Sequence, residues 1–350
     1  MINDSSTIDL FKKEVLEKKE DQNTGNSKEK LQRLDISGEL RRKILPLCRL
    51  KKGEIWEDPI NGHRVGVLDA TISKDVESIV QESKDALMVN DPPYNVVVGN
   101  ANTKSLSKIS IDGYMTFSEK WIKNSVYHTK KDSHHYIWIG ADYKDNFQPL
   151  PDLMLLLRKF AELTPRNMIT MRNQRGYGTQ KNWMWVRQEL LYYTKGSPKF
   201  NIEAVDTDIP KILRGYYKKV KGKMTENLER SKSKNIRAGN VWVDIQQVFY
   251  RMEENVPGCY AQKPLKSIER IIESSSKKGD RVMDFFSHSG KTLIAGEILG
   301  RKIYTFDLDP VYAELTIRRL ERLREEGKTG WQWKNPFPEL DDKSGNNRWI

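Results

Sequence analysis

The sequence predicts an α/β protein built on a doubly wound, mostly parallel sheet with helices on both faces. Short apolar segments of strand length alternate with polar or helical segments, which is the pattern of such sheets. Two of these segments run directly into motifs of polar and small residues, at the strand ends where open sheets bind ligands. The expected strands are residues 64–68, 86–89, 135–139, 167–171, 189–193, 281–286 and 302–306.

The size and composition favour a protein that needs no covalent cross-links. The 350 residues suffice for a large core. Cys48 and Cys259 lack the spacing of a disulfide framework or a zinc site, so a reducing cytoplasm is the expected location. A signal-peptide core and an apolar run of membrane-spanning length are both missing from the sequence, so we expect neither secretion nor a membrane partner.

Positive charge is concentrated in one part of the chain. The net charge is +12, and the window 211–240 contains ten Lys or Arg residues against two Glu. Fixed positive charge attracts polyanions such as nucleic acids. The alternation of strands and helices also stops between about 197 and 261, so we expect an inserted segment there. A solvated basic loop would explain the charge equally well, so the window alone assigns no function.

The first motif, Asn90-Asp91-Pro92-Pro93-Tyr94, follows the expected strand 86–89. Its bland interpretation is a rigid turn. Its chemical interpretation starts from the exocyclic amine of a nucleobase, a poor nucleophile because its lone pair is delocalised into the ring. The Asp91 carboxylate and the Pro92 carbonyl would each accept one N–H bond and free the lone pair, while the prolines keep the carbonyl rigid. Tyr94 would stack on a base rotated out of its duplex.

The second motif spans residues 282–292 and predicts an apolar strand, a turn of small residues and a helix that begins near Thr292. Small residues let the backbone approach a ligand closely. The next strand ends at Asp307 and Asp309, and a carboxylate at this place usually accepts the ribose hydroxyls of a nucleotide-type ligand. Together these features predict a site for an adenosine-containing cofactor.

The tripeptide Gly290-Lys291-Thr292 also ends a phosphate-binding P-loop, which would indicate an ATP-dependent nucleic-acid enzyme. That motif requires a glycine five residues before its Gly-Lys pair, and Phe285 occupies this position. The P-loop interpretation is therefore disfavoured. An ordinary strand–turn–helix unit is the remaining alternative, and it leaves Asp307 and Asp309 unexplained.

In this order the two motifs resemble the β group of DNA amino-methyltransferases, in which the catalytic motif precedes the cofactor motif. The resemblance covers about residues 60–325. The cofactor motif of the family is Asp-Pro-Phe-x-Gly-x-Gly-Thr-Thr, and Phe285, His288 and Lys291 depart from it. His288 replaces the first glycine, which bears on the contacts with the methionine end of the cofactor. The matching residues are Asp284, Phe286, Ser289, Gly290 and Thr292.

Three further segments resemble parts of the same family. They are Gln262-Lys263-Pro264-Leu265 before an expected helix at 267–274, Val67-Leu68-Asp69-Ala70 near the cofactor adenine, and the strand region 185–196 with Glu189. On local sequence alone, the first would be a helix start and Asp69 a strand-end cap. The resemblance implies a catalytic loop of Asp91, Pro92, Pro93 and Tyr94. It implies cofactor contacts at Asp69, Ala70, Gln262, Lys263, Pro264, Asp284, Phe285, Phe286, Ser287, Ser289, Gly290, Thr292, Asp307 and Asp309.

The implied activity is site-specific transfer of a methyl group from S-adenosylmethionine to the exocyclic N6 of adenine in double-stranded DNA, with no metal. Cytosine N4 is the alternative target, because it too is an exocyclic amine beside a ring acceptor. In the family, Asp at the first loop position goes more often with adenine and Ser with cytosine. The alternative from another class is a non-catalytic DNA-binding protein with the same fold, against which Asp91 and Tyr94 argue. RNA and free nucleotides are less favoured substrates.

The implied organisation is a permuted Rossmann-like domain with an insertion. We expect an arm (1–39), a catalytic half (40–196), a target-recognition insertion (197–261), a cofactor half (262–330) and a surface tail (331–350). The expected DNA-backbone contacts are Lys218, Lys219, Lys221, Lys223, Arg230, Lys232, Lys234 and Arg237, and bases would be touched by Trp242, Tyr216, Tyr217 or the loop 172–177. The resemblance also allows a homodimer, a cognate restriction endonuclease and a prokaryotic or phage origin.

Overall fold

The main feature of the protein is a nine-stranded sheet with the order β1-β2-β13-β12-β3-β4-β6-β5-β11. The computed structural model describes residues 34, 38–81, 85–94, 111–140, 148–177, 183–210, 217–226 and 234–341. The strands are β1 (Ile55–Glu57), β2 (Arg64–Val67), β3 (Asp85–Asn90), β4 (Thr129–Ile139), β5 (Leu163–Tyr177), β6 (Trp185–Lys195), β11 (Val241–Trp242), β12 (Arg281–Asp284) and β13 (Lys302–Asp307). Every segment that the sequence predicted as a strand contributes to this sheet.

The sheet is mostly parallel and doubly wound, as the sequence predicted. β2, β13, β12, β3 and β4 run parallel, and β6 is antiparallel to both of its neighbours. The central strands β3 and β12 pair through Leu87 with Val282 and Met88 with Met283. From β3 the chain continues to β4 on one side, and from β12 to β13 on the other. The strand order therefore reverses between β3 and β12, where sheets of this kind bind their ligands.

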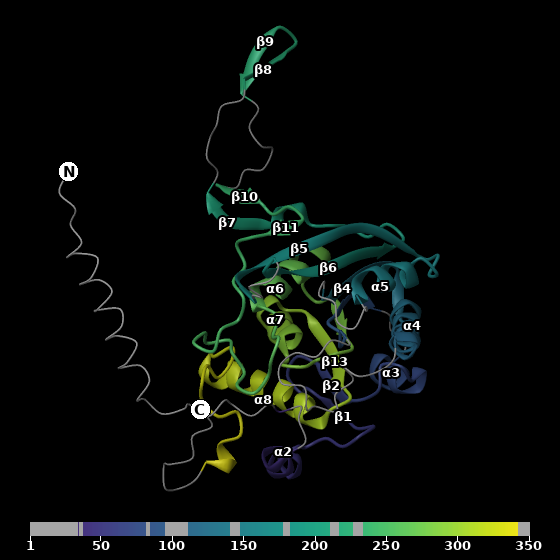
Figure 1. Ribbon diagram of the computed structural model, residues 1–350, viewed down its shortest axis with the longest axis vertical. Coiled ribbons are helices and arrows are strands. Elements are labelled where there is room, and N and C mark those ends of the chain that lie inside the picture. The colour runs from purple at the N-terminus through teal and green to yellow at the C-terminus, as the bar shows by residue number, and fades with distance from the viewer. Residues whose placement is uncertain are drawn as a thin grey trace, which may run out of the picture.

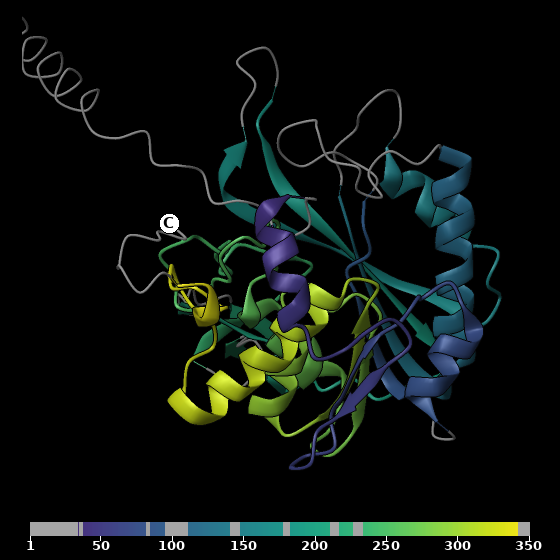
Figure 2. The ribbon, with the colours of Figure 1, turned by 90° about the horizontal axis from the view of Figure 1, so that it is seen from below.

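Helices cover both faces of the sheet (Figures 1 and 2). The first face carries α6 (Leu265–Ser275), α7 (Lys291–Leu299) and α8 (Pro310–Glu326), and the second carries α3 (Ser73–Val80), α4 (Ile111–Tyr127) and α5 (Pro149–Leu157). Each set packs its apolar side chains on the strands in a separate core. The described residues also form α2 (Glu39–Ile44) and the short 3-10 helices η1 (Leu45–Leu47), η3 (Ile202–Ala204) and η4 (Pro338–Leu340).

The expected surface tail is wrong for Trp331 and Phe337, whereas Trp333 and Lys334 between them are exposed. Trp331 and Phe337 are buried against α2 and the outer side of α8, where they join Ile44, Val311 and Leu315 in a third core. Figure 2 shows α2 beside α8. Burial of large aromatic side chains lowers the free energy of the folded protein. It therefore favours packing of this segment against α2 and α8. Residues 342–350, like 1–33 of the expected arm, lie outside the described residues.

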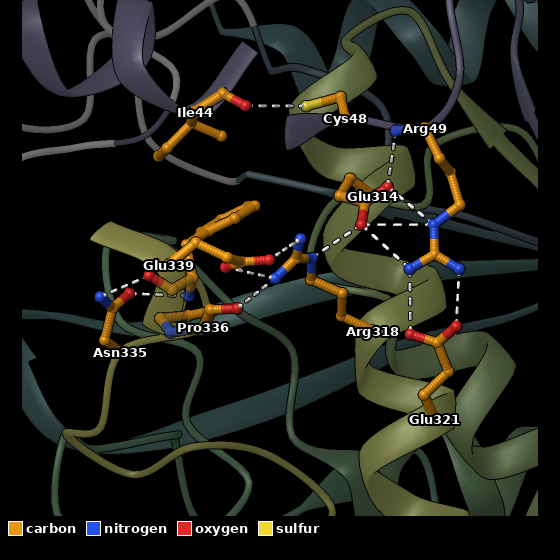
Figure 3. Close-up of polar contacts among 10 residues, drawn as sticks. Ile44, Cys48, Arg49, Glu314, Arg318, Glu321, Asn335, Pro336 and Glu339 are labelled. Atoms are coloured by element: carbon orange, nitrogen blue, oxygen red, sulfur yellow. Dashed lines mark hydrogen bonds and ion pairs between the residues drawn. The ribbon is translucent and has the colours of Figure 1, made fainter. Parts of the chain in front are cut away.

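A cluster of charged side chains ties the N-terminal segment and the tail to α8 (Figure 3). The Glu314 carboxylate, only 1% exposed, accepts hydrogen bonds from Nε of Arg49 at 3.0 Å and Nε of Arg318 at 2.7 Å. Arg49 also binds Glu321, and Arg318 binds Glu339 beyond the helix. Glu314 thus compensates two guanidinium groups from different parts of the chain.

The expected insertion forms small β structures. β7 (Asp206–Pro210) pairs with β10 (Asn235–Arg237), and β8 (Tyr217–Val220) pairs with β9 (Lys223–Glu226). The β8–β9 hairpin turns at Lys221 and Gly222, which both have positive φ, as a two-residue turn of this kind requires. Figure 1 shows this hairpin far from the main sheet. Along the described segments, no helix has the length and apolar character to cross a membrane.

Candidate active site

The expected catalytic loop and the expected cofactor turn meet where the strand order reverses. Asn90 ends β3, and its buried Oδ1 atom accepts the backbone N–H of Phe285, which follows β12, at 3.0 Å. This hydrogen bond fixes the two strand ends to each other. Asp91 and Asp284, the neighbours of the two bonded residues, consequently line one pocket although they are far apart in the sequence.

Within the catalytic loop, the Tyr94 hydroxyl donates a hydrogen bond to Oδ1 of Asp91 at 2.5 Å. The Tyr94 ring packs on Gly140 after β4, where an added Cβ atom would lie 3.0 Å from Cδ2 of the ring. A larger residue at 140 would therefore displace Tyr94. Pro92 is buried, and its carbonyl accepts no hydrogen bond from any described residue. The loop thus presents an oriented carboxylate and a carbonyl that has no partner among the described residues.

The structure places the ammonium group of Lys263 on the catalytic loop. Nζ lies 2.9 Å from Oδ1 and 2.7 Å from Oδ2 of Asp91, and the side chain is 5% exposed. The same ammonium lies 5.1 Å from the ring centre of Tyr94 and 5.3 Å from that of Trp138. The sequence had indicated a cofactor contact for Lys263, whereas its charge is compensated by Asp91.

Gln262 holds the segment in front of Lys263. Its buried amide donates to the carbonyls of Val256 and Cys259 and to the side chain of Asn255, and it accepts the N–H of Val256, all at 2.9–3.0 Å. The side chain is thus fully used in closing the loop. Pro264 follows directly and precedes the first turn of α6.

The expected cofactor turn is built around Asp284, which ends β12. Its Oδ2 atom accepts the Thr292 hydroxyl at 2.5 Å, and its Oδ1 atom accepts the N–H of Phe286 at 2.9 Å. The next residue, Phe285, is buried and packs on Phe306 of β13 with ring centres 4.9 Å apart. Asp284 therefore joins the two ends of the strand–turn–helix unit.

The turn contains two left-handed residues. Gly290 has φ of 74°, and an added Cβ atom would lie 3.0 Å from Cα of Thr316 in α8. His288 has φ of 43°, although left-handed backbone is uncommon for residues other than glycine. The N–H of His288 donates to Oδ2 of Asp307 at 3.0 Å. The turn therefore keeps a left-handed conformation at the position where the resembled family has glycine.

Two carboxyl groups of this region titrate far from their usual range. Desolvation raises the pKa of Asp284 to about 7, and the nearby charge of Asp91 adds to the effect. Desolvation followed by the charge of Asp309 raises the pKa of Asp307 to about 7. Strongly shifted carboxyl groups in a pocket are typical of functional sites.

Asp307 is better placed for a ligand than Asp309. Both oxygens of Asp309 accept hydrogen bonds from Arg41 at 2.7 Å, and Oδ1 also caps α8 through the N–H of Val311. Oδ1 of Asp307 accepts the N–H of Asp309 at 3.0 Å. Each Asp307 oxygen thus receives one backbone bond and keeps a lone pair for a hydroxyl.

The two expected contacts near β2 lie at the same end of the sheet as Asp307, because the N–H of Leu68 donates to the Asp307 carbonyl at 3.0 Å. Oδ1 of Asp69 accepts both the N–H and the hydroxyl of Thr71, at 2.8 and 2.7 Å. Ala70 is buried, and its carbonyl accepts the amide of Asn124 at 2.8 Å. The Asp69 side chain thus forms hydrogen bonds within the turn in which it lies.

The pocket between loop and turn contains buried polar atoms that have no partner. Ser287 Oγ and Trp138 Nε1 are buried and form no hydrogen bond with described residues. Such atoms usually bind a ligand or water, so the pocket fits a ligand with several polar groups. The lining residues are Val89, Asp91, Trp138, Lys263, Ile268, Asp284, Phe286, Ser287, His288, Ser289, Lys291 and Thr292.

Lys291 is not arranged like the lysine of a P-loop. Its Nζ atom donates to the Glu254 carbonyl at 2.9 Å and forms an ion pair with the carboxylate of that residue. Burial lowers the pKa of Lys291 to about 7. Arg319, buried in α8, also binds the Glu254 carbonyl at 2.8 Å, and it binds the carbonyl of Ser289 in the turn. The sequence did not lead us to predict that Arg319 supports the turn. The one signal was that Arg319 is a charged residue on the apolar side of α8.

The expected DNA contacts are only partly described. Lys219, Lys221, Lys223, Lys234 and Arg237 are exposed. The side chain of Lys218, together with Tyr216, Arg230 and Lys232, lies outside the described residues, and of Tyr217 only the backbone is described.

The structure also describes the positions of two other expected base contacts, Trp242 and the backbone of residues 172–177. Trp242 is 4% exposed and packs on Trp138 with ring centres 6.4 Å apart, so little of its side chain is accessible to solvent. The expected loop 172–177 is the end of β5.

A doubly wound sheet with a nucleotide-type turn and an oriented carboxylate that faces it is the arrangement that the sequence predicted for a methyltransferase that acts on an amine. The family model described as DNA methylase, N6_N4_Mtase, matches residues 86–318, and the chain belongs to this family. Its members are the β-group DNA amino-methyltransferases, which use S-adenosylmethionine and methylate N6 of adenine or N4 of cytosine.

Similar proteins are bacterial DNA methyltransferases. Type II methyltransferase M.HpaI of Haemophilus parainfluenzae is 25% identical over 242 residues, which are 69% of this chain and 70% of the relative. DNA adenine methyltransferase YhdJ of Escherichia coli (strain K12) is 26% identical over 255 residues, 71% of this chain and 79% of the relative. The solved PvuII DNA methyltransferase (cytosine-N4-specific) has the same fold, with a TM-score of 0.53, 13% identity and coverage of 77% of this chain and 88% of that one.

Proposed function

We propose that the chain transfers a methyl group from S-adenosylmethionine to the exocyclic N6 of adenine in double-stranded DNA. The observation that carries the proposal is the shared pocket of Asp91 and the turn after Asp284. An amine held by the loop would lie beside a cofactor held by the turn, and this proximity is the main requirement of the reaction.

The loop can hold the amine through two acceptors. Oδ2 of Asp91 has one hydrogen bond within the described chain, and the Pro92 carbonyl has none. Each can accept one N–H of the amine, which draws its nitrogen toward tetrahedral geometry. When bound, the cofactor supplies a methyl group on a sulfonium, whose C–S electron pair stays with sulfur as the N–C bond forms. The extra proton on the nitrogen leaves through Oδ2 of Asp91 to water.

The cofactor half supplies groups suited to S-adenosylmethionine. Asp307 can accept the ribose hydroxyls, and the orphaned Ser287 hydroxyl can bind a polar group of the methionine end. Asp284, Thr292 and Gly290 shape the turn around them.

The choice of adenine over cytosine rests on Asp91 as the first residue of the loop. The test is expression in a bacterial host that lacks its own DNA methyltransferases, followed by mass spectrometry of the DNA nucleosides. We expect N6-methyldeoxyadenosine, and its absence with an Asp91→Ala variant. N4-methyldeoxycytidine instead would establish the cytosine alternative. DNA binding without any methylated nucleoside would favour the non-catalytic alternative.

Asp307→Ala is expected to weaken S-adenosylmethionine binding by about 1.5 to 3 kcal/mol, the range for hydrogen bonds to a charged group. The acceptor role of Asp307 needs the ionised carboxylate, which predominates at pH values above its pKa of about 7. Cofactor affinity of the wild type should therefore rise from pH 6 to pH 8, and this rise should be smaller in the variant. Titration calorimetry measures both effects. Wild-type affinity in Asp307→Ala would move the role to Asp309 or remove it.

The β8–β9 hairpin and its flanks are proposed as the main electrostatic contact with DNA. Lys221 lies in the turn of the hairpin, and Lys219 and Lys223 lie two residues from it on either side. All three are exposed, as is Lys234, which directly precedes β10. Such cations hold phosphates without reading sequence. The proposed target-recognition insertion is the segment 197–261.

Reversal of Lys219, Lys221, Lys223 and Lys234 to Glu is expected to weaken DNA binding and to flatten its salt dependence. The slope of log K against log salt should fall by roughly one unit for each lost phosphate contact. Fluorescence anisotropy at several salt concentrations measures it. A matched variant reverses four exposed lysines away from the hairpin, Lys120, Lys123, Lys277 and Lys278. Equal slope changes in both variants would contradict a specific role for the hairpin.

A restriction endonuclease is proposed as the functional partner, because similar proteins such as M.HpaI are named type II methyltransferases. Such a partner would cut the sequence that this chain methylates. Modified-base sequencing of the host DNA described above gives that sequence. Protection of the same sites from a purified endonuclease then tests the pairing.

A further inference from the structure

We propose that Lys263 is a positioning residue for methyl transfer, which holds the Asp91 carboxylate with a single acceptor site left for the target amine. The inference rests on the proposed function of the pocket. It assigns to Lys263 a task on the catalytic loop in place of a contact with the cofactor.

The number of hydrogen bonds to Asp91 carries the first step. A carboxylate offers about four acceptor sites, two on each oxygen. Oδ1 accepts the Tyr94 hydroxyl at 2.5 Å and Nζ of Lys263 at 2.9 Å, which fills it. Oδ2 accepts Nζ of Lys263 at 2.7 Å and no other described residue. One site on Oδ2 therefore remains, and an amine that binds Asp91 can occupy only that site.

The second step is that Lys263 has little freedom to leave. Its backbone lies between Gln262, which forms four hydrogen bonds within its loop, and Pro264, whose carbonyl accepts the Ser267 hydroxyl at 2.6 Å. Its ammonium packs on the rings of Tyr94 and Trp138. A buried cation held on aromatic faces is stabilised where it lies, so it fixes the rotation of the Asp91 carboxylate.

The third step concerns charge. Two carboxyl groups, Asp91 and Asp284, line the pocket, and its two ammonium groups are those of Lys263 and Lys291. Lys291 is paired with Glu254. Lys263 is thus the cation that compensates the catalytic loop. Without it, Asp91 would be a half-buried carboxylate held by the Tyr94 hydroxyl alone, free to rotate away from the amine.

The test compares Lys263→Met with wild type in single-turnover transfer of labelled methyl to DNA from a methylation-deficient host, with cofactor and DNA saturating. The methionine side chain is unbranched like that of lysine and one atom shorter, and it carries no charge. We expect the rate to fall by about 100-fold, the effect of a misplaced reacting group, with cofactor and DNA dissociation constants within about threefold of wild type. Lys277→Met, which removes an exposed lysine, is the matched control.

Two results would overturn the proposal. A Lys263→Met rate within about fivefold of wild type would show that the carboxylate needs no positioning cation. A tenfold or larger loss of cofactor affinity with an unchanged rate at saturation would make Lys263 a cofactor ligand. Thermal unfolding of the variant shows whether the fold is intact. A wild type that methylates no DNA would instead overturn the proposed function, so the two failures are distinguishable.

Chemical rescue gives a readout that a purely structural lysine would not move. In Lys263→Ala the missing ammonium can be replaced by n-propylammonium from solution. We expect this ion to raise the rate of the variant at least about tenfold, which restores part of the rate lost through misplacement of Asp91. Tetramethylammonium at the same concentration controls for ionic strength and cannot donate a hydrogen bond. Equal rates with both salts would overturn the proposal.

Discussion

Asp91→Ala is expected to abolish detectable methyl transfer while S-adenosylmethionine and duplex DNA still bind within about tenfold of wild type. The carboxylate interacts most strongly with the amine as its nitrogen becomes tetrahedral and positive. An interaction made mainly in the transition state affects turnover far more than binding. Single-turnover transfer of labelled methyl, with binding measured in parallel, provides the test. A rate near that of wild type would mean that residues 91–94 are not the catalytic loop.

Two companion variants separate the roles within the loop. Asp91→Asn keeps an acceptor oxygen but no charge, and it should also lose most of its rate. Tyr94→Ala should weaken stacking of the rotated base, at a cost of about 1 to 3 kcal/mol, and it also removes a hydrogen bond to Asp91. Because Asp91 compensates the buried Lys263, thermal unfolding of each variant is needed to show that the pocket is intact.

Glu314→Gln is expected to lower the free energy of unfolding by about 3 kcal/mol. Breaking a buried ion pair costs about 3 to 5 kcal/mol when the remaining charge has no other partner, whereas Arg49 keeps Glu321 and Arg318 keeps Glu339. Glu314 serves Arg49 and Arg318 at once. The lower end of the range applies because the Arg49 side chain is 34% exposed and water can solvate it. Urea denaturation followed by circular dichroism measures the change.

Glu321→Gln is the matched control for this prediction. Glu321 binds the same Arg49, but its side chain is 42% exposed. Exposed ion pairs contribute about 0 to 1 kcal/mol, so this variant should unfold close to wild type. Similar losses in both variants would show that burial of Glu314 is not the origin of the effect.

The sequence by itself determined the fold class and predicted which residues form the candidate site. Alternating short apolar segments predicted the sheet, because a strand buried on both faces must be apolar along its whole length. Residues 90–94 and 284–292 could be singled out because each forms a contiguous stretch, and the ends of parallel strands share one edge of the sheet. Pro310, Gly327 and the capping Asp309 fixed α8 locally.

Only the tertiary structure decided which charges meet. Lys263 binds Asp91 and Lys291 binds Glu254, and no sequence pattern predicts these contacts because they join segments that lie far apart in the sequence. The same holds for Trp331 and Phe337, expected in a surface tail and buried against α8. Periodicity and motifs encode local geometry, whereas partner choice among buried ionic and aromatic side chains depends on how the folded elements pack.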